Sequence, residues 1–319
     1  MYLAANSQAL YRSGAERSVT FPAGEPGSGR AALPGGASNV LAERQPGAGT
    51  SVAPAMLRVD GICKTYVQRP PHVQVLHDIN FAVEEGRFVT LLGPSGCGKT
   101  TLLTLVGGFH KPTGGQMFIK EREIRKPGPD RGFVFQNYAL FPWMTVKQNV
   151  QFPMKERGLP RREREKLCAR LLDMAQLNGT EDKYPSQLSG GMKQRVAFIR
   201  VLAGDPDILL LDEPLGAIDP QMRKTLQVEL ENLWLQDRKT VLMVTHDIDE
   251  AVYLSDRILV MAPCAAEISL KTGSNLIAAI DVDLPRPHNR KSPEYQAVLR
   301  QVEQTLESIG SLKKEPEPE

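Results

Sequence analysis

The sequence predicts an α/β fold built around a buried parallel sheet. Residues 88–92 read Phe-Val-Thr-Leu-Leu and lead into a glycine-rich turn, and residues 208–211 are wholly apolar and precede two carboxylates. Short apolar runs of this kind are typical of parallel strands that are covered on both faces. Helical patterns also occur, such as the apolar face formed by Met222, Leu226, Leu230 and Leu233.

The turn after the first run, residues 93–101, is called the phosphate loop below. It reads GPSGCGKTT and fits the pattern G-x-x-x-x-G-K-[ST], with Lys99 and Thr100 at the last two fixed positions. Glycines let the backbone N–H groups point inward beside a helix N-terminus, which suits phosphate. Lys99 would reach the β- and γ-phosphates and Thr100 would be a ligand of Mg²⁺. The flanking strand and helix favour this interpretation over a turn that binds nothing. We therefore expect a nucleotide to contact Gly93, Pro94, Ser95, Gly96, Cys97, Gly98, Lys99, Thr100 and Thr101.

Length and composition limit the other classes of function. The chain has 319 residues and a net charge of +2, which argues against a nucleic-acid binder with a broad basic face. Its cysteines, Cys63, Cys97, Cys168 and Cys264, lack metal-ligand or CxxC spacing, so we expect a reducing, cytosolic setting. No apolar run approaches the roughly 18 residues that cross a bilayer. We expect any membrane role to come through a partner.

Residues 1–55 differ from the rest of the chain. They are dominated by Gly, Ala, Pro and Ser, and such a composition buries too little apolar surface to offset the entropy of ordering. We expect a disordered, low-complexity extension that is dispensable for activity, and the segment lacks the apolar core of a secretory signal. The alternatives are a transit peptide, because Arg12, Arg17 and Arg30 sit among few acidic residues, and an over-extended reading frame whose true start is Met56.

The remaining elements follow from hydrophobic periodicity and turn residues. Alternating or apolar runs predict strands at residues 57–60, 73–75, 79–83, 116–119, 131–135, 240–245, 257–261 and 278–282. Apolar residues at helical spacing predict helices around residues 102–106, 163–177, 196–202, 222–233, 247–253 and 295–309. We interpret the basic pair Arg161 and Arg162 as a solvated helix start rather than as a contact with lipid headgroups or a partner.

A second helix start has the character of an anion site. Residues 187–195 read QLSGGMKQR, and a helical pattern follows directly. Ser189, Gly190 and Gly191 combine small side chains with free N–H groups at the positive end of a helix dipole. A capped helix that binds no ligand would have the same kind of sequence, so the interpretation as an anion site depends on the other motifs.

Polar residues follow two of the buried strands. Asp212 and Glu213 come after residues 208–211, at the carboxyl edge where open α/β sheets bind ligands. Beside the phosphate loop, Asp212 would hold Mg²⁺, and Glu213 would orient and deprotonate the water that attacks the γ-phosphate. His246 follows the strand at 240–245 and is placed to donate a hydrogen bond to a γ-phosphate, although a lone histidine is more often structural.

Together these motifs resemble the ATP-binding subunits of ABC transporters. The segments GPSGCGKT, LSGGMKQR and LLLDEP occur in that family's order, with Gln136 between the first two and His246 after the third. The likeness covers roughly residues 57–262, and the serine-glycine-glycine signature separates it from kinases and GTPases. It implies a P-loop NTPase of the ABC ATPase type, with a RecA-like α/β core, an antiparallel β subdomain and an inserted helical subdomain.

The resemblance also implies a domain organisation. The cassette would span residues 56–264, with the helical subdomain at roughly 137–204. Residues 265–319 would form a C-terminal extension with an accessory strand, an accessory helix and a charged tail.

The family further implies a shared active site. Two cassettes face each other head to tail there, so that Ser189, Gly190 and Gly191 of one copy close over the nucleotide held by Lys99 of the other. Asp219 would lie at the seam of this homodimer.

Two more roles come from the same resemblance. Gln136 would be a ligand of Mg²⁺, take part in catalysis and pass the state of the site to the helical subdomain. Tyr66 falls where the family's adenine-stacking aromatic lies, whereas the residues alone favour a partly buried tyrosine of a sheet.

A narrower resemblance points to importers of nitrate, taurine and aliphatic sulfonates. It rests on LFPWMTV at residues 140–146 and on Leu-Pro-Arg-Pro at residues 284–287. The family places the first segment near the groove for the permease, and Phe141 with Trp143 would suit such an interface. Residues 264–274 depart from the subfamily's pattern.

We therefore expect an ATPase that uses ATP and Mg²⁺ to power uptake of a small anionic solute such as nitrate, taurine or an alkanesulfonate. It would work as a homodimer beneath two permease subunits, peripherally on the cytoplasmic face of the inner membrane, with an extracytoplasmic binding protein acting indirectly and no nucleic-acid partner. The alternatives are export, a soluble ABC-type ATPase of DNA maintenance or translation, and a regulatory module that binds ATP without hydrolysis. The solute's identity is not encoded here, because this subunit would not contact it.

Overall fold

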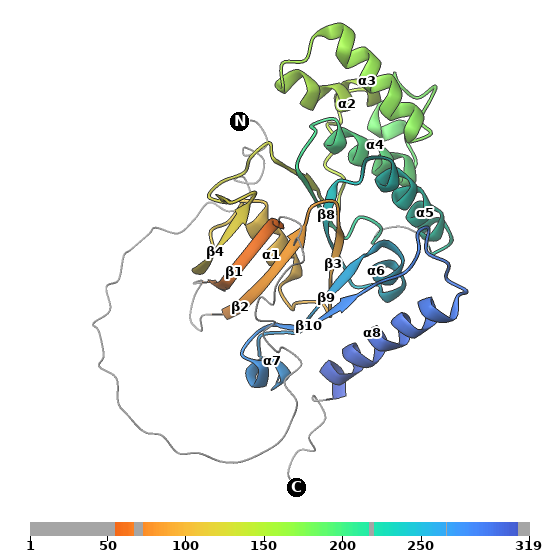
Figure 1. Cartoon of the computed structure of the whole chain (residues 1–319). Coiled ribbons are helices and arrows are strands. Elements are labelled where there is room, and N and C mark those ends of the chain that lie inside the picture. Colours follow the sequence, from red (N-terminus) through yellow and green to blue (C-terminus); the bar gives the residue numbers. More distant parts are fainter. Residues whose placement is uncertain (1–54, 67–72, 217–219, 266, 312–319) are drawn as a thin grey trace, which may run out of the picture. The chain divides into compact units, whose positions relative to one another are not determined.

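The computed structural model of the protein describes residues 55–66, 73–216, 220–265 and 267–311 (Figure 1). All of them lie in one compact unit, Ser51–Glu319. Several expectations fall outside these residues, namely the disorder of residues 1–54, the placement of Asp219 and the charged tail at 313–319.

A six-stranded sheet forms the centre, as the apolar runs predict. Its strand order is β10-β9-β3-β8-β7-β6, and all neighbours pair in parallel except β10, which runs antiparallel to β9. The strands are β3 (Phe88–Leu92), β6 (Arg131–Val134), β7 (Ile208–Asp212), β8 (Thr240–Thr245), β9 (Arg257–Met261) and β10 (Leu276–Asp281).

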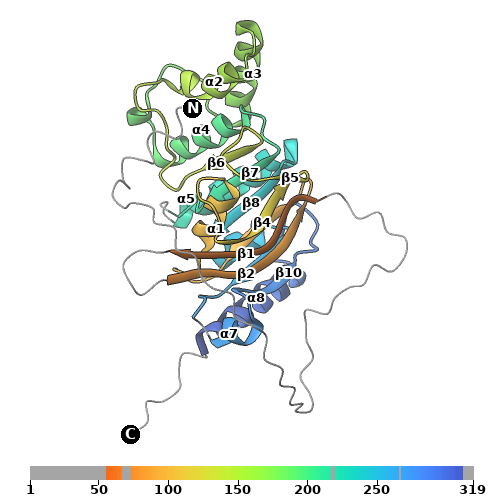
Figure 2. The same cartoon turned by 90° about the vertical axis from the view of Figure 1, so that its left-hand side faces the viewer.

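A second, antiparallel sheet has the order β2-β1-β4-β5 (Figure 2). Its strands are β1 (Ala55–Tyr66), β2 (Val73–Glu84), β4 (Gly114–Ile119) and β5 (Arg122–Glu123). The two strands expected at 73–75 and 79–83 are a single strand. Ile62 pairs with Ile79 but Lys64 pairs with Leu76, so β2 carries one extra residue there. Asp78, at φ 45°, lies in this bulge.

Helices cover both faces of the central sheet. Helix α1 (Lys99–Val106) packs between the two sheets, and its leucines are fully buried. The helices in the C-terminal third of the chain are α5 (Pro220–Asp237), α6 (Ile248–Leu254), α7 (Glu267–Thr272) and α8 (Pro293–Ser311). The expected apolar stripe of α8 is buried at Tyr295, Val302 and Ile309, whereas the short helix α7 is not predicted by the sequence.

The two covered faces explain why the strands are apolar throughout. In β7, Leu209 and Leu211 belong to the core cluster with α5, α6 and α8. Ile208 and Leu210 belong to the cluster with α1 and the antiparallel sheet. Since side chains alternate along a strand, a sheet covered on both faces needs apolar residues at every position.

A separate helical cluster is formed by α2 (Val146–Glu156), α3 (Arg161–Met174) and α4 (Gly190–Leu202), drawn in green and green-blue in Figure 1. The sequence analysis predicts α3 and α4 but misses α2. Thr145 and Gln148 form a reciprocal capping box at its start, a signal that is readable in the sequence. Pro153 inside the helix hides the pattern, because proline normally breaks a helix.

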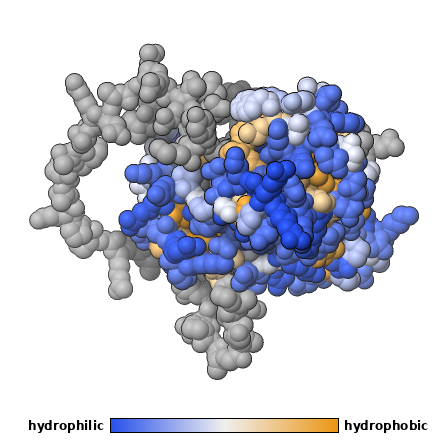
Figure 3. Space-filling model, turned by 90° about the horizontal axis from the view of Figure 1, so that it is seen from above, coloured by the Kyte–Doolittle hydropathy of each residue, from blue (hydrophilic) through white to orange (hydrophobic). Residues whose placement is uncertain are grey.

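The exposed surface is mixed. Seen from above, it is mostly hydrophilic, with apolar residues showing in small patches (Figure 3). In the part of the chain that the structure describes, no helix is long and apolar enough to span a membrane.

Candidate active site

Four sequence-predicted groups come together at one edge of the central sheet. The phosphate loop follows β3, Asp212 ends β7, His246 follows β8 and Gln136 comes shortly after β6. These strands are mutually parallel, and Leu92 lies opposite Thr245 in the register. Their carboxyl ends therefore share one edge, which is the ligand-binding edge of an open α/β sheet.

Close packing explains two glycines of the phosphate loop. A Cβ at Gly93 would lie 2.2 Å from the carbonyl oxygen of Met261, and one at Gly98 would lie 2.7 Å from Cδ2 of Leu76. Gly98 also has φ +100°, a left-handed conformation that favours glycine. A Cβ at Gly96 would meet nothing within 4 Å. The loop is thus packed against the core on one side and open at Gly96.

Lys99 places a cation inside the phosphate loop. Its side chain is only 6% exposed, and Nζ donates to the carbonyl oxygens of Gly93 at 2.7 Å and Pro94 at 3.0 Å. The buried thiol of Cys97 lies beside it, and burial raises the pKa of that thiol against the opposing effect of Lys99. A buried ammonium within a glycine loop fits a polyphosphate ligand.

Oxygen donors suited to a magnesium ion lie next to the loop. Thr100 Oγ1 donates to Asp212 Oδ1 at 3.0 Å, and hydroxyl and carboxylate oxygens are the donors that Mg²⁺ prefers. Burial raises the pKa of Asp212, Glu213 adds to this effect, and the Thr100 hydrogen bond and Lys99 oppose it. A bound cation would favour the ionised carboxylate. Gln136 is exposed and makes no side-chain hydrogen bond within the described residues.

Glu213 and His246 form the second pair of the site. His246 Nδ1 lies 3.2 Å from Glu213 Oε1. The backbone of Glu213 has φ 43°, and its N–H donates to the carbonyl of Val244 at 3.0 Å. Non-glycine residues in this left-handed region are strained, and such strain often occurs at functional sites. The pair joins a carboxylate that can accept a proton from water to a ring that can donate a hydrogen bond.

A buried carboxyl group that the sequence analysis missed lies behind His246. Glu250 is 2% exposed and hydrogen-bonds to Thr245 Oγ1, which also accepts from Asp247 N–H. Asp247 Oδ1 accepts from Glu250 N–H at 3.0 Å and caps α6. Burial raises the pKa of Glu250 to about 7. The capping pattern Asp-x-x-Glu after His246 is the signal that could have found it.

The signature residues lie at the start of α4. Ser189 is the N-cap, and its hydroxyl accepts from Met192 N–H at 3.3 Å. Ser189 and Gly190 are exposed. Among the described residues of this single chain, no hydrogen bond or ion pair joins the signature residues to the phosphate loop. The N-terminus of α1 at the phosphate loop and the N-terminus of α4 at the signature residues are therefore not in polar contact within the described part of one chain.

Tyr66 lies in the sheet that adjoins the phosphate loop. It ends β1 and pairs with Val73 of β2, the strand whose Leu76 approaches Gly98. The ring is partly exposed, and Lys64 Nζ lies 5.1 Å from its centroid. The position is compatible with a base that stacks on the ring.

The segment after Gln136 is tied to the signature helix by a second buried cation that sequence reasoning missed. Arg200 of α4 donates to the carbonyls of Ala139 at 2.8 Å and Tyr138 at 3.3 Å. Both of those residues have positive φ angles, 44° and 61°. Burial lowers the pKa of Arg200 to about 10, and its guanidinium lies 5.3 Å from the ring of Phe141.

Asn149 of α2 holds the next part of the same segment. Its amide accepts from Phe141 N–H at 2.9 Å and donates towards the carbonyls of Phe141, Met144 and Thr145. Trp143, within this held loop, is 65% exposed. The loop thus presents an aromatic side chain from a fixed backbone.

Comparison with known proteins gives consistent results. The family described as "ABC transporter" matches residues 76–216. The "Uncharacterized ABC transporter ATP-binding protein MJ0412" of Methanocaldococcus jannaschii is 44% identical over 259 residues, which is 81% of this chain and 94% of that protein. The "Aliphatic sulfonates import ATP-binding protein SsuB" of Bacillus cereus is 41% identical over 256 residues, 80% of this chain and 97% of the relative.

Solved structures agree with the fold. The "Dimeric Structure of MJ0796, a Bacterial ABC Transporter Cassette" has a TM-score of 0.61 and 32% identity, and covers 71% of this chain and 99% of its own. A post-hydrolysis dimer of the same cassette "bound to ADP and Pi" has a TM-score of 0.60 with the same identity and coverage.

Proposed function

The chain belongs to the ATP-binding proteins of ABC transporters, and on that premise we propose that it energises an importer for a small anionic solute. It is an ATPase of the ABC type. The observation that carries the proposal is the meeting of Lys99, the Thr100–Asp212 pair and the Glu213–His246 pair at one sheet edge. Import of nitrate, taurine or an alkanesulfonate is supported by the aliphatic sulfonate relative.

The loop and its neighbours would bind the nucleotide. Lys99 would exchange the carbonyls of Gly93 and Pro94 for the β- and γ-phosphates, and Tyr66 would stack on the adenine. Thr100, Asp212 and Gln136 would hold Mg²⁺. The ion, when bound, neutralises charge on the phosphate oxygens.

Glu213 would act as the base in hydrolysis. Its carboxylate takes a proton from a water molecule, the water oxygen bonds to the γ-phosphorus, and the bond to the β–γ bridging oxygen breaks to give ADP and phosphate. His246, 3.2 Å from Glu213, would donate a hydrogen bond to a γ-phosphate oxygen. Because Glu213 and His246 already lie beside each other, the two side chains are preorganised for the reaction.

A second copy would complete the site. Ser189, Gly190 and Gly191 of the partner would cover the triphosphate, and Asp219 would lie at the seam between the copies. Enclosure from both sides excludes water and strengthens the electrostatic contacts. The dimer of the similar cassette MJ0796 supports this arrangement. Hydrolysis would weaken the contact, because the split products repel each other.

The proposal also includes membrane partners. Trp143 and the loop held by Asn149 would dock on one of two permease subunits at the cytoplasmic face of the inner membrane. A solute-binding protein on the other side would act only through the permeases, and no nucleic acid is involved.

A Glu213→Gln variant tests the function directly. ATP binding should persist, because the amide keeps the shape of the side chain, while steady-state hydrolysis should fall by roughly a hundredfold or more. ATP should then convert the monomer into a stable dimer, measured by light scattering. Glu165→Gln, on the exposed face of α3, is the matched control and should behave as wild type. Normal hydrolysis by Glu213→Gln, or a monomer at every ATP concentration, would refute the proposal.

The solute class needs the assembled transporter. ATPase activity of the complex with its permeases and binding protein should rise on addition of taurine, an alkanesulfonate or nitrate. If none of these anions raised the ATPase activity, the proposed solute class would be wrong.

A further inference from the structure

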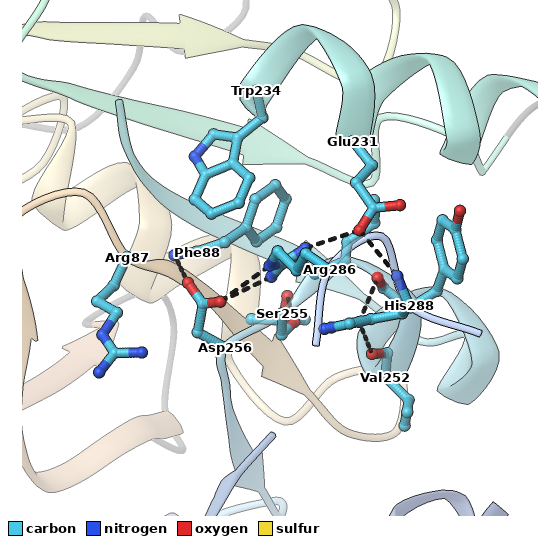
Figure 4. Close-up of polar contacts among 12 residues, drawn as sticks. Arg87, Phe88, Glu231, Trp234, Val252, Ser255, Asp256, Arg286 and His288 are labelled. Atoms are coloured by element: carbon cyan, nitrogen blue, oxygen red, sulfur yellow. Dashed lines mark hydrogen bonds and ion pairs between the residues drawn. The ribbon is translucent and has the colours of Figure 1, made fainter. Parts of the chain in front are cut away.

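The C-terminal extension enters the core at Arg286. Figure 4 shows this side chain between Asp256 and Glu231. The ion pairs measure 2.8 Å to Asp256 Oδ1 and 3.1 Å to Glu231 Oε1, and the guanidinium lies 4.5 Å from the ring of Trp234. Asp256 Oδ2 in turn accepts from Phe88 N–H at 2.8 Å, at the start of β3. Arg286 thus contacts α5 directly and reaches the start of the strand that leads to the phosphate loop through Asp256.

The same segment holds the last turn of α6. Arg286 Nη2 donates to the carbonyl of Leu254 at 2.8 Å. His288 Nδ1 donates to the carbonyls of Tyr253 at 2.9 Å and Val252 at 3.2 Å (Figure 4). These carbonyls belong to the helix C-terminus, where no intrahelical donor is available. The extension supplies the donors instead.

It also holds the first turn of α6. Arg290 Nε lies 3.1 Å from Asp249 Oδ2, and Tyr295 OH donates to Asp249 Oδ1 at 2.7 Å. The guanidinium of Arg290 also bonds to Gln227 of α5 and stacks 3.5 Å from the ring of Tyr253. Both ends of α6 are therefore fixed by residues 286–295.

Helix α6 needs such support. It has seven residues, fewer than an isolated helix requires, so its position depends on tertiary contacts. His246 comes two residues before its first helical residue, and Asp249 comes three residues after His246. A displacement of the first turn of α6 would move the His246 backbone and with it the 3.2 Å contact to Glu213.

We propose that residues 286–295 of the C-terminal extension position His246, with Arg290 and Tyr295 as positioning residues that act through Asp249. The inference rests on the proposed function, in which His246 takes part in hydrolysis. The polar contacts to Asp249 are distinct from the apolar anchoring of α8, which is provided by the buried side chains of Val302 and Ile309 and by the ring of Tyr295. The Arg290–Asp249 pair is itself partly exposed, with side chains 25% and 37% accessible, and pairs of this kind add little to stability.

Tyr295→Phe and Arg290→Met test the proposal in the full-length protein. Tyr295→Phe keeps the buried ring and removes only its hydroxyl's contact to Asp249, whereas Arg290→Met removes the ion pair to Asp249 together with the bond to Gln227. We expect kcat to fall by roughly threefold to tenfold with the KM for ATP unchanged, since a small displacement of a reacting group costs rate and not ground-state binding. The ring resonances of His246, assigned by their loss in His246→Ala, should also shift in the NMR spectrum of histidine-labelled protein.

Arg257→Met is the matched control. Arg257 pairs with Asp281 at 2.5 Å and so also joins the extension to the core, but at the start of β9, the opposite edge of the sheet from the site. This variant should leave both kcat and the His246 resonances unchanged. Equal effects in Arg257→Met would overturn the proposal, because any loosening of the extension would then suffice.

A double-mutant cycle adds a second criterion. If Tyr295 acts through His246, Tyr295→Phe should have no further effect on residual hydrolysis in the His246→Ala background. Independent, multiplying effects would overturn the proposal, as would unshifted His246 resonances. Failure of the wild-type protein to hydrolyse ATP would refute the proposed function instead, while the NMR comparison would still decide whether the extension positions His246.

Discussion

The two carboxylates at the end of β7 have different surroundings, which suit the different roles that we propose for them. Asp212 continues the strand towards Thr100, and its raised pKa reflects burial beside another acid. Glu213 turns out of the strand through its left-handed backbone and approaches His246. The left-handed backbone of Glu213 thus turns the two neighbouring carboxylates towards different partners, Thr100 and His246.

Glu250 makes stability depend on pH. Its pKa is raised to about 7 in the folded protein, mainly by burial, with Asp247 and Glu213 adding to the effect and Thr245 and Arg223 opposing it. The folded state therefore keeps a proton that the unfolded chain loses near its ordinary pKa of 4.5. Stability falls as pH rises between these two values, by about 3 kcal/mol, and the effect levels off above pH 7.

Glu250→Gln should remove this pH dependence, because the amide stays neutral and can still hydrogen-bond to Thr245. Chemical unfolding at pH 5 and pH 8 measures the change. The variant should gain stability relative to wild type at pH 8 and lose that advantage at pH 5. Parallel pH profiles for the two proteins would show that the Glu250 carboxyl is not the titrating group.

The loop between β6 and α2 is fixed from two sides. Arg200 of α4 holds its first carbonyls, and Asn149 of α2 holds its last ones. Gln136 precedes the carbonyls held by Arg200, and Trp143 lies within the stretch from Phe141 to Met144 that Asn149 holds. A displacement at the nucleotide edge would thus reach the proposed docking surface through a stiff connection.

Asn149→Ala should release the second clamp. Asn149 is fully buried, and its loss leaves several backbone groups of the loop without partners, at a cost of about 3 kcal/mol. Thermal unfolding measures this cost. Hydrogen exchange should also be faster at the Phe141 amide, because its N–H donates to Asn149 Oδ1 in the wild-type protein. Asn178→Ala, which loses an exposed bond to Asp173, should change neither quantity. Unaltered exchange at Phe141 would contradict the clamp.

Local signals in the sequence predict the elements better than they predict these clamps. Buried strands such as β3, β7 and β8 can be predicted because nearly all their positions are apolar. Helix α8 can be predicted because its apolar residues recur at helical spacing. Helix α2 is missed because Pro153 interrupts its helical pattern. Strand β2 is wrongly predicted as two strands because the bulge at Asp78 shifts the alternation of apolar and polar residues.

The polar groups that order the site are harder to predict. Arg200 contacts backbone carbonyls that lie 61 and 62 residues away in the sequence. Every residue has a backbone carbonyl, so the residue type does not indicate which ones accept such a bond. The strand ends, by contrast, are predictable in position, because parallel strands share a carboxyl edge. The roles of all the predicted site residues are proposals, and Asp219 lies outside the described residues.

At the scale of the whole molecule, we propose that residues 56–264 form the cassette and that residues 1–55 are dispensable. Met56 is buried, and its carbonyl accepts from Lys120 N–H at 3.0 Å. Folding contacts of the described chain therefore begin at the start of β1. The later elements β10 and α8 add buried side chains to the same core.

A chain that starts at Met56 should retain the ATPase rate and the thermal unfolding temperature of the full chain. A chain that starts at Gly61 is the control, because it lacks the half of β1 that pairs with Phe81 and Met117, and it should fail to fold. Loss of hydrolysis in the Met56 form would assign a role to the N-terminal residues.

The burial of Cys97 has a chemical consequence for the phosphate loop. A thiol in such a loop is chemically vulnerable, since its alkylation or oxidation would obstruct the proposed nucleotide site. The thiolate is the reactive form, and burial holds Cys97 as the protonated thiol, away from reagents. ATP turnover should therefore survive electrophiles that consume the more accessible sulfur of Cys63.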